Sequence, residues 1–345
     1  MLSTTLVPDE IIPLLQQAGL PQRFRATSLP GGSNNRVYRI DLESSSVLLK
    51  AYFQHPDDLR DRLRAEFSFS RFAWDQGLRC LARPLVRDQQ RKLGLYEFIE
   101  GRLLAWHEIG HSEVQQSISF FHELNRHKFD ASARKLPCGS EACFTITQHL
   151  ACVERRIMSL VQVDDSTPLG KRAMEMVRRE LVPAWQRTRD IVADQAAQWN
   201  LAPDAAIARE DECLSPSDFG FHNAILAADG RLRFIDFEYA GWDDPAKMVC
   251  DFFCQPEVPV SHEYFEDYTR TVVADLSNPE MHFRRIFLLL PVYRIKWCCI
   301  MLNDFLKVGS RRRSFARSAE DEDARKRSQL EKVGKMLMQI DMRGT

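Results

Sequence analysis

The first hundred residues follow patterns that are typical of β-strands. Apolar and polar positions alternate over residues 36–40, and residues 47–53 are rich in side chains that favour strands. Residues 43–46 between them can turn one strand back onto the other as a hairpin. Two further strands are expected at residues 84–86 and 92–99. A small β-rich unit is therefore predicted at this end of the chain.

One helix is expected inside this strand-rich stretch. Pro56 is tolerated in the first turn of a helix, and Asp57 and Asp58 suit its positive end. Glu66 then falls near the same face as several apolar side chains, and Gly77 predicts the end of the helix.

From about residue 108 onward, apolar positions recur at helical spacing. We expect helices at residues 112–127, 141–162, 168–199, 244–254, 280–307 and 320–340. A short β-like segment interrupts the series, because residues 224–227 and 231–237 flank Asp229-Gly230, a pair typical of a tight hairpin turn.

This order of elements predicts an α+β chain with two lobes. A small β-rich lobe covers residues 1–100, and a larger α-helical lobe with the embedded hairpin covers residues 101–345. The length of 345 residues agrees with about two domains. Lys and Arg number 47 against 48 Asp and Glu, a net charge of −1. This balance argues against a protein that coats nucleic acid through bulk charge.

The remaining composition points to a cytoplasmic protein. The longest apolar run, residues 286–302, contains Arg294 and Lys296, so we expect no membrane span. The nine cysteines show no short-spaced disulfide framework, and the first residues carry Asp9 and Glu10 instead of a basic region. Both features predict a reducing cytoplasm. Nothing in the sequence fixes the oligomeric state.

The segments around the predicted hairpin carry the candidate chemistry. Asp218 and Asn223 are five residues apart, and Asp236 lies thirteen residues beyond Asn223. Carboxylate and amide oxygens brought together by a loop and a hairpin suit Mg²⁺, which keeps water and phosphate oxygens as its other ligands. We expect Asn223 and Asp236 to hold the metal. Asp218 is then free to accept a hydrogen bond or a proton from a hydroxyl.

This spacing resembles the catalytic loop of kinases and the metal-binding Asp that follows it. Residues 235–245 read Ile-Asp-Phe-Glu-Tyr-Ala-Gly-Trp-Asp-Asp-Pro, which looks like the aminoglycoside phosphotransferase and choline kinase-like family. The resemblance implies a bilobal protein-kinase-like fold. It also implies transfer of the γ-phosphoryl group of ATP or GTP, with Mg²⁺, to the hydroxyl of a small molecule, with Asp218 as the catalytic residue.

The same resemblance extends to a phosphate-binding loop. Residues 29–38 look like the family's loop between the first two strands. Glycines there let the backbone approach a phosphate, and small polar side chains offer contacts. The expected nucleotide contacts are Gly31, Gly32, Ser33 and Asn34.

Further residues resemble the family's nucleotide-binding groups. Lys50 follows an apolar triplet on the next strand and resembles the lysine that pairs with the α- and β-phosphates. Glu66 resembles its ion-pair partner on the helix. Residues 96–101 resemble the adenine hinge, where the backbone of Glu97 and Ile99 would bond the adenine edge.

One departure from the family pattern concerns the catalytic loop. Pro216 stands where the family usually has a His two residues before the catalytic Asp. His222 either replaces that His in part or has a packing role. The departure keeps open a nucleotide-binding pseudokinase that serves as a scaffold. Retention of the other motif residues favours an enzyme.

The acceptor is expected to be a sugar, an amino alcohol or a related metabolite. An aminoglycoside antibiotic carries several ammonium groups and needs an acidic pocket, whereas the helical lobe offers mixed charge that includes Arg155 and Arg156. Phosphorylation of an aminoglycoside remains the alternative. Asp243 and Asp244 either line the acceptor pocket or cap the helix that begins at Pro245.

Two cysteines remain to be explained. Cys250 and Cys254 are four residues apart on a predicted helix and could face one metal. No second His or Cys pair in the right register accompanies them, so core packing is favoured.

Overall fold

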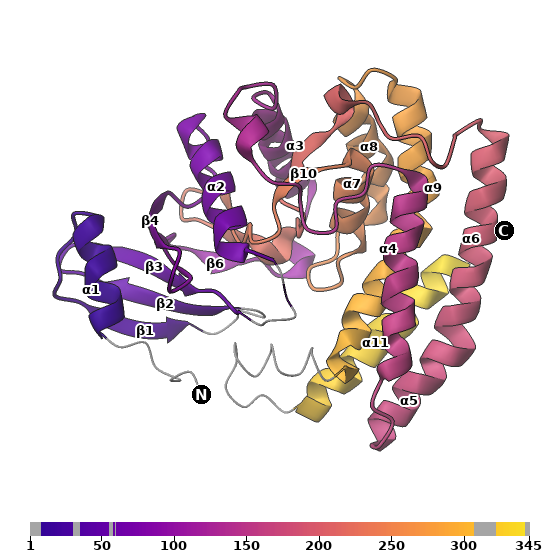
Figure 1. Cartoon of the computed structure of the whole chain (residues 1–345), viewed down its shortest axis with the longest axis horizontal. Helices are drawn as coiled ribbons and strands as arrows, with labels where there is room; N and C mark the ends of the chain where they lie inside the picture. Colours follow the sequence, from indigo (N-terminus) through magenta and orange to yellow (C-terminus); the bar gives the residue numbers. More distant parts are fainter. Residues whose placement is uncertain (1–7, 30–34, 55–57, 59, 307–321, 342–345) are drawn as a thin grey trace.

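The structure is a computed structural model that describes residues 8–29, 35–54, 58, 60–306 and 322–341. Its amino-terminal part is rich in sheet and lies beside a larger part built mostly of helices (Figure 1). The chain is therefore of the mixed α and β class, as the order of predicted elements indicated.

The amino-terminal part contains a five-stranded sheet in the order β1-β2-β3-β5-β4, in which all neighbours are antiparallel. The strands are β1 (Arg25–Leu29), β2 (Arg36–Asp41), β3 (Ser46–Ala51), β4 (Pro84–Asp88) and β5 (Leu93–Glu97). The hairpin of β2 and β3 confirms the alternation in the sequence. Helix α1 (Pro8–Gln17), which the sequence analysis did not predict, packs its Leu14 and Leu15 into the sheet core with Ile40 and Leu95.

Helix α2 (Arg62–Asp75) lies between β3 and β4 in the chain and begins later than residue 56, where the sequence pattern placed its start. Asp61 caps this helix by accepting a 3.1 Å hydrogen bond from the Arg64 N–H. Asp58 accepts from the Arg62 side chain at 2.6 Å instead of capping a helix. The acidic cap is thus Asp61, three residues after Asp58. At the other end, Gly77 follows the helix with a φ of 91°.

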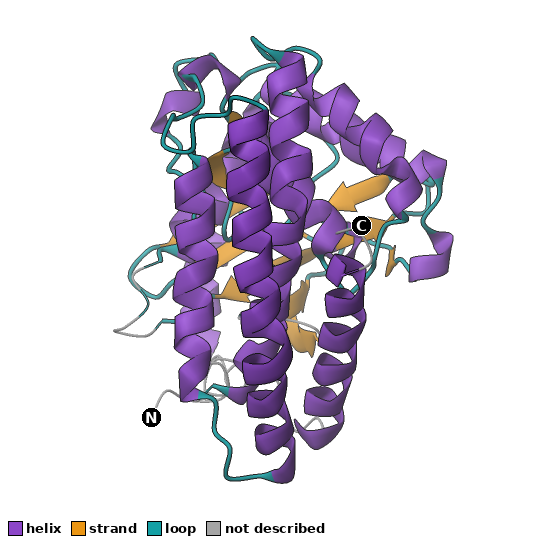
Figure 2. Cartoon of the chain, turned by 90° about the vertical axis from the view of Figure 1, so that its right-hand side faces the viewer, coloured by secondary structure: helices purple, strands orange, loops and turns teal. Residues whose placement is uncertain are grey.

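The larger part holds most of the helices. They are α3 (His111–Asn125), α4 (Ile146–Ser159), α5 (Pro168–Met176), α6 (Val182–Gln198), α7 (Pro245–Cys254), α8 (Phe265–Val273), α9 (Pro279–Leu302) and α11 (Glu322–Asp341). A π-helical turn, Val177–Leu181, connects α5 to α6 within the predicted helix 168–199. The long helices run side by side along one side of the molecule (Figure 2), and α9 contacts α4, α6, α7 and α11.

Short strands between these helices form the frame of the candidate site. β8 (Ala224–Leu226) and β9 (Leu232–Phe234) form the predicted hairpin, and β6 (Arg102–Leu103) pairs with β8. β7 (Cys213–Ser215) pairs with β10 (Gly241–Asp243). β7 comes just before the candidate catalytic loop, and β10 comes just before α7.

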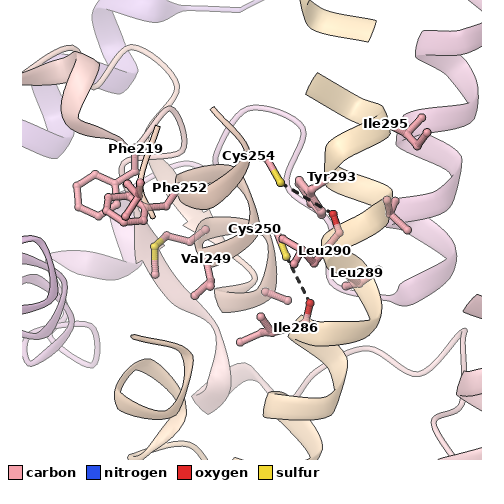
Figure 3. Close-up of a cluster of buried hydrophobic side chains, with 14 of the residues drawn as sticks. Phe219, Val249, Cys250, Phe252, Cys254, Ile286, Leu289, Leu290, Tyr293 and Ile295 are labelled. Atoms are coloured by element: carbon pink, nitrogen blue, oxygen red, sulfur yellow. Dashed lines mark hydrogen bonds between the residues drawn. The ribbon is translucent and has the colours of Figure 1, made fainter. Parts of the chain in front are cut away.

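The packing of α7 against α9 explains two of the cysteines (Figure 3). The Cys250 thiol donates to the Ile286 carbonyl at 3.5 Å, and the Cys254 thiol to the Leu290 carbonyl at 3.9 Å. Both side chains are buried in the main hydrophobic core. They therefore serve core packing, as the sequence analysis favoured over a metal site.

The apolar run of the sequence lies in this same core. Within the described part of the chain, Pro279–Phe305 is the one helical stretch long and apolar enough to cross a membrane, and 72% of its apolar window is buried inside the structure. Arg285, Arg294 and Lys296 lie along α9 as buried residues. Packing against α4, α6, α7 and α11 therefore accounts for the apolar character of this helix.

Candidate active site

The catalytic loop follows β7 and has an unusual backbone conformation. Ser217 has a φ of 69°, in the left-handed region, and the Asp218 N–H donates to the Pro216 carbonyl at 3.0 Å. The Ser217 N–H donates to the Ser215 hydroxyl at 3.0 Å. These contacts hold the strained Ser217 in place directly before Asp218, the candidate catalytic carboxylate.

A buried lysine provides a further brace for this loop. Lys247 on α7 donates a 2.8 Å hydrogen bond to the Ser217 hydroxyl and lies 2.7 Å from Asp243 and 3.4 Å from Asp251. The Lys247 side chain is 2% exposed. The sequence analysis missed Lys247, because no local pattern marks a lysine thirty residues from the loop it contacts.

The candidate catalytic carboxylate lies next to His222. The His222 Nε2 atom is 3.3 Å from Asp218 Oδ1. Burial by itself would raise the pKa of Asp218, but His222, Lys296 and Lys247 outweigh it and hold the pKa below its ordinary value. Asp218 is therefore ionised at neutral pH, which suits a group that accepts a hydrogen bond from a hydroxyl.

The two expected metal ligands come together through the hairpin. The Ile235 N–H donates to the Asn223 carbonyl at 3.0 Å, which brings Asp236 next to Asn223. The Asn223 amide nitrogen donates to the Asp218 carbonyl at 3.0 Å and leaves the amide oxygen as a ligand. Asp236 has a φ of 67°, and both residues line the same cleft as Asp218.

This donor set fits Mg²⁺. In the part of the chain that the structure describes, no group of three or more His, Cys, Asp or Glu side chains could hold a metal ion. One carboxylate and one amide oxygen are too few ligands for a closed structural site. They match an ion that completes its octahedron with water and phosphate oxygens.

Lys50 joins the sheet to this metal site. Its Nζ atom lies 2.9 and 2.8 Å from the two oxygens of Glu66, the expected partner on α2, and 2.6 Å from Asp236 Oδ1. The Tyr52 hydroxyl donates to Glu66 at 2.7 Å. Burial alone would lower the pKa of Lys50, but Asp236, Glu66 and Glu238 hold it above its ordinary value. Lys50 is thus a permanent cation beside the candidate metal ligand.

A second polar cluster follows Asp236 and was not predicted from the sequence. Glu238 accepts a 2.6 Å hydrogen bond from the Asn35 amide and lies 3.6 Å from the Arg62 guanidinium. Burial and the nearby Asp236 raise the pKa of Glu238 to about 7. Asn35 lies within the predicted phosphate loop of residues 29–38, so this contact ties that loop to the segment after the hairpin.

The structure describes only some of the other predicted nucleotide contacts. Gly31, Gly32, Ser33 and Asn34 lie outside the described residues. Glu97 is the last residue of β5, and its N–H donates to the Arg83 carbonyl at 2.8 Å. Its N–H is therefore already bonded within the protein, and the adenine contact predicted for Glu97 would have to use the carbonyl. Ile99 follows in the half-buried turn after β5.

One cleft of about 980 Å³ joins the reacting groups. Asp218, Asn223, Asp236, His222 and Lys247 line it, and it extends to residues of α9 and α11. Asp243 and Asp244, in contrast, do not line it. Asp244 caps α7 by accepting from the Ala246 N–H at 2.7 Å, so the capping role applies to this residue.

Comparison with solved structures identifies the fold. The chain resembles spectinomycin phosphotransferase, in its complex with ADP and spectinomycin, at 13% identity and a TM-score of 0.65, with 97% of each chain covered. It resembles an ethanolamine kinase from Plasmodium vivax at 14% identity and a TM-score of 0.55, covering 91% of this chain and 82% of that one. A choline/ethanolamine kinase family protein from Mesorhizobium loti matches at 16% identity and a TM-score of 0.53, covering 97% and 100%.

These similarities lie in the structure, because no family model matches the sequence and no curated protein matches it significantly. At such low identities, the likeness establishes the fold alone. The chain has the kinase-like fold that aminoglycoside phosphotransferases and choline/ethanolamine kinases share, which confirms the resemblance found in its motifs.

Proposed function

We propose that this protein is a small-molecule kinase, which transfers the γ-phosphoryl group of ATP or GTP to a hydroxyl of its acceptor. The observation that carries the proposal is the position of Lys50, which bonds Glu66 and Asp236 at once. A buried lysine held between these carboxylates beside Asn223 and Asp218 is the arrangement that phosphoryl transfer requires.

The proposal assigns a role to each part of the fold. The sheet-rich residues 1–100 form the nucleotide lobe, and residues 101–345 form the catalytic and acceptor lobe of a bilobal kinase. Lys50 neutralises the α- and β-phosphates, while Gly31, Gly32, Ser33 and Asn34 cradle phosphate oxygens. The backbone of Glu97 and Ile99 bonds the adenine edge.

Asp218 acts on the acceptor. Its carboxylate orients the acceptor hydroxyl toward phosphorus and takes the proton late, since this chemistry depends chiefly on positioning and electrostatics. Asn223 and Asp236 hold Mg²⁺, which supplies positive charge for the phosphate oxygens when it is bound. Lys247 and Ser217 keep the loop of Asp218 in one geometry.

A second candidate is phosphorylation of an aminoglycoside antibiotic. The structural similarity to spectinomycin phosphotransferase, at a TM-score of 0.65, favours it. The pseudokinase alternative has less support, because Lys50, Glu66, Asp218, Asn223 and Asp236 are all retained. A cytoplasmic location would supply the nucleotide that either kinase needs.

The experiment is a coupled assay of ADP release from ATP, with Mg²⁺ and without acceptor. We expect slow hydrolysis that EDTA abolishes and that Asp236→Ala removes. Asp229→Ala, in the exposed turn of the same hairpin, is the matched control and should keep the rate. Hydrolysis that persists in Asp236→Ala, or its absence in the unmodified protein, would contradict the proposal.

A further inference from the structure

The cleft that contains Asp218 and Asp236 continues well beyond these reacting groups. Its walls include Glu141 ahead of α4, together with Gln329 and Lys332 on α11. The volume of about 980 Å³ is near the upper end of the range of about 300–1,000 Å³ for sites that bind drug-sized ligands. The nucleotide phosphates beside Asp236 would take up part of this volume, and the walls beyond them are left for the acceptor.

The acidic side chains in these walls form ion pairs with basic side chains of the protein itself. Asp236 lies beside Lys50, and every other acidic side chain that the structure describes in the cleft, except Asp218, lies beside a Lys or Arg. The pairs are Glu141 with Arg156 at 2.5 Å, Asp251 with Lys296 at 2.9 Å, Glu257 with Lys332 at 2.9 Å and Asp304 with Arg325 at 3.3 Å. An ammonium group of a ligand therefore has to compete with a cation that the protein already supplies.

This competition is unfavourable, because some of the pairs are buried. Asp251 and Asp304 are each 2% exposed, and breaking a buried ion pair leaves an uncompensated charge. The arrangement thus gives little affinity for a polycation. The more exposed pair of Glu141 and Arg156 can still bind an uncharged group, because a hydroxyl can donate to the carboxylate and accept from the guanidinium.

The walls contain further groups that could form hydrogen bonds with a ligand. Arg156 Nε and Gln329 Oε1 are buried and have no hydrogen-bond partner among the described residues. The first is a donor and the second an acceptor. Leaving such a group without a partner costs about 1–3 kcal/mol, and a ligand hydroxyl that reaches one of these atoms after a side-chain adjustment would recover this free energy. Ser140, Asn303 and Ser328 add further polar groups to the same walls.

We propose that the acceptor is an uncharged polyhydroxylated molecule, a sugar or a sugar-like polyol. This inference rests on the proposed kinase function and names the acceptor class for the same cleft. One acceptor hydroxyl gives its proton to Asp218 and forms a new bond from its oxygen to the γ-phosphorus. The bond between that phosphorus and the bridging oxygen of ATP breaks, and its electron pair leaves with ADP.

The test is a coupled ADP-release assay with Mg-ATP and three sets of acceptors. The uncharged set is glucose, galactose, N-acetylglucosamine, maltose and myo-inositol. The polycationic set is kanamycin and spectinomycin, and the third set is choline and ethanolamine. We expect at least one uncharged compound to raise ADP release above the acceptor-free rate, with the phosphate ester detected by mass spectrometry. Its kcat/KM should exceed that of every cationic compound.

A pair of glutamine variants tests the site of binding. Gln329→Ala should raise KM for the uncharged acceptor by about tenfold, the effect of losing one to two hydrogen bonds. Gln198→Ala, an exposed glutamine on α6, is the matched control and should leave KM unchanged. A higher kcat/KM for a cationic compound, no response to any uncharged compound, or an unchanged KM in Gln329→Ala would overturn the inference.

Failure of the kinase function itself would appear differently. It would remove Mg²⁺-dependent ADP formation with and without acceptor, and ADP release would not respond to Asp218→Asn. Preference for a cationic acceptor with intact Mg²⁺ dependence would leave the kinase function standing and reject only the acceptor class.

Discussion

Lys247 donates a 2.8 Å hydrogen bond to the hydroxyl of Ser217, the residue directly before the candidate catalytic Asp218. Lys247 is fixed in turn by Asp243 and Asp251. Pro216, which stands where the family that the motifs resemble usually has a His, cannot provide a side-chain hydrogen bond to the loop. The side-chain contact from α7 therefore adds to the hydrogen bonds within the loop, such as that from the Ser217 N–H to the Ser215 hydroxyl.

Removing this brace should impair turnover more than nucleotide binding. Ser217→Ala deletes the hydroxyl that Lys247 contacts but leaves the buried ion pairs intact. We expect kcat to fall by about tenfold or more, because a displacement near 1 Å can cost up to about a hundredfold in rate. KM for ATP should change little, as measured by steady-state kinetics. Ser166→Ala, an exposed serine before α5, is the control, and an equal loss there would argue against a specific role.

The ion pair of Lys50 and Glu66 should govern use of the nucleotide. Glu66→Gln removes the charge that holds Lys50 and keeps the shape of the side chain. Lys50 then remains bonded to Asp236 and points less well at the phosphates. We expect kcat/KM for ATP to fall by about tenfold to a hundredfold, which corresponds to about 1.4–2.8 kcal/mol. Glu175→Gln, which only breaks a surface pair with Arg179, should leave kcat/KM within a factor of two.

The pH dependence of turnover should carry no signature of Asp218 near neutrality. Its pKa is held below the ordinary value of about 3.9, so the carboxylate stays ionised throughout the neutral range. We expect Asp218→Asn to lower kcat by orders of magnitude and to leave Kd for Mg-ATP within a few-fold. An acid limb of kcat near pH 6 to 7 that disappears in Asp218→Asn would show that Asp218 titrates there.

Asp244 should contribute to stability through its buried charge. It lies 3.0 Å from His149 and accepts from Arg285, and the side chain is fully buried. Burial would raise its pKa, but Arg285 and His149 lower it below the ordinary value. The contribution is therefore present above the unfolded pKa of about 3.9 and is lost as the pH falls through the folded pKa.

The variant Asp244→Asn tests this contribution and keeps the helix cap. Leaving Arg285 without its carboxylate should cost about 3–5 kcal/mol at pH 7. Thermal unfolding should show a Tm lower by roughly 5 °C or more. The difference from the unmodified protein should shrink as the pH is lowered toward 3. Asp229→Asn in an exposed turn serves as control, and an equal Tm loss there would contradict the account.

The sequence predicted those parts of the site that lie in local motifs. Asp218, Asn223 and Asp236 share one loop and hairpin, so their spacing already placed them together. Lys50 and Glu66 were assigned through their order relative to the phosphate loop, and the structure brings them within 2.8 Å.

Contacts between distant segments could not be predicted in the same way. Lys247 lies on α7, which is buried along most of its length, and only the fold brings this lysine to Ser217. The place of Glu238 in the site is likewise evident only from its contact with Asn35, more than two hundred residues away in the chain. Helix α2 starts at Arg62 because Asp61 accepts from the Arg64 N–H, and the sequence pattern did not distinguish this cap from Asp58.

The central claim is that Asp236 and Asn223 hold the metal through which this cleft binds nucleotide. Isothermal titration of ATP into the unmodified protein and Asp236→Asn, each with Mg²⁺ and with EDTA, tests it most directly. We predict that Mg²⁺ tightens ATP binding by the unmodified protein and has no such effect in Asp236→Asn. The metal-free Kd should agree within a few-fold, because Lys50 and Glu66 remain in place. Unchanged Mg²⁺ enhancement in Asp236→Asn, or collapse of its metal-free affinity, would contradict the account.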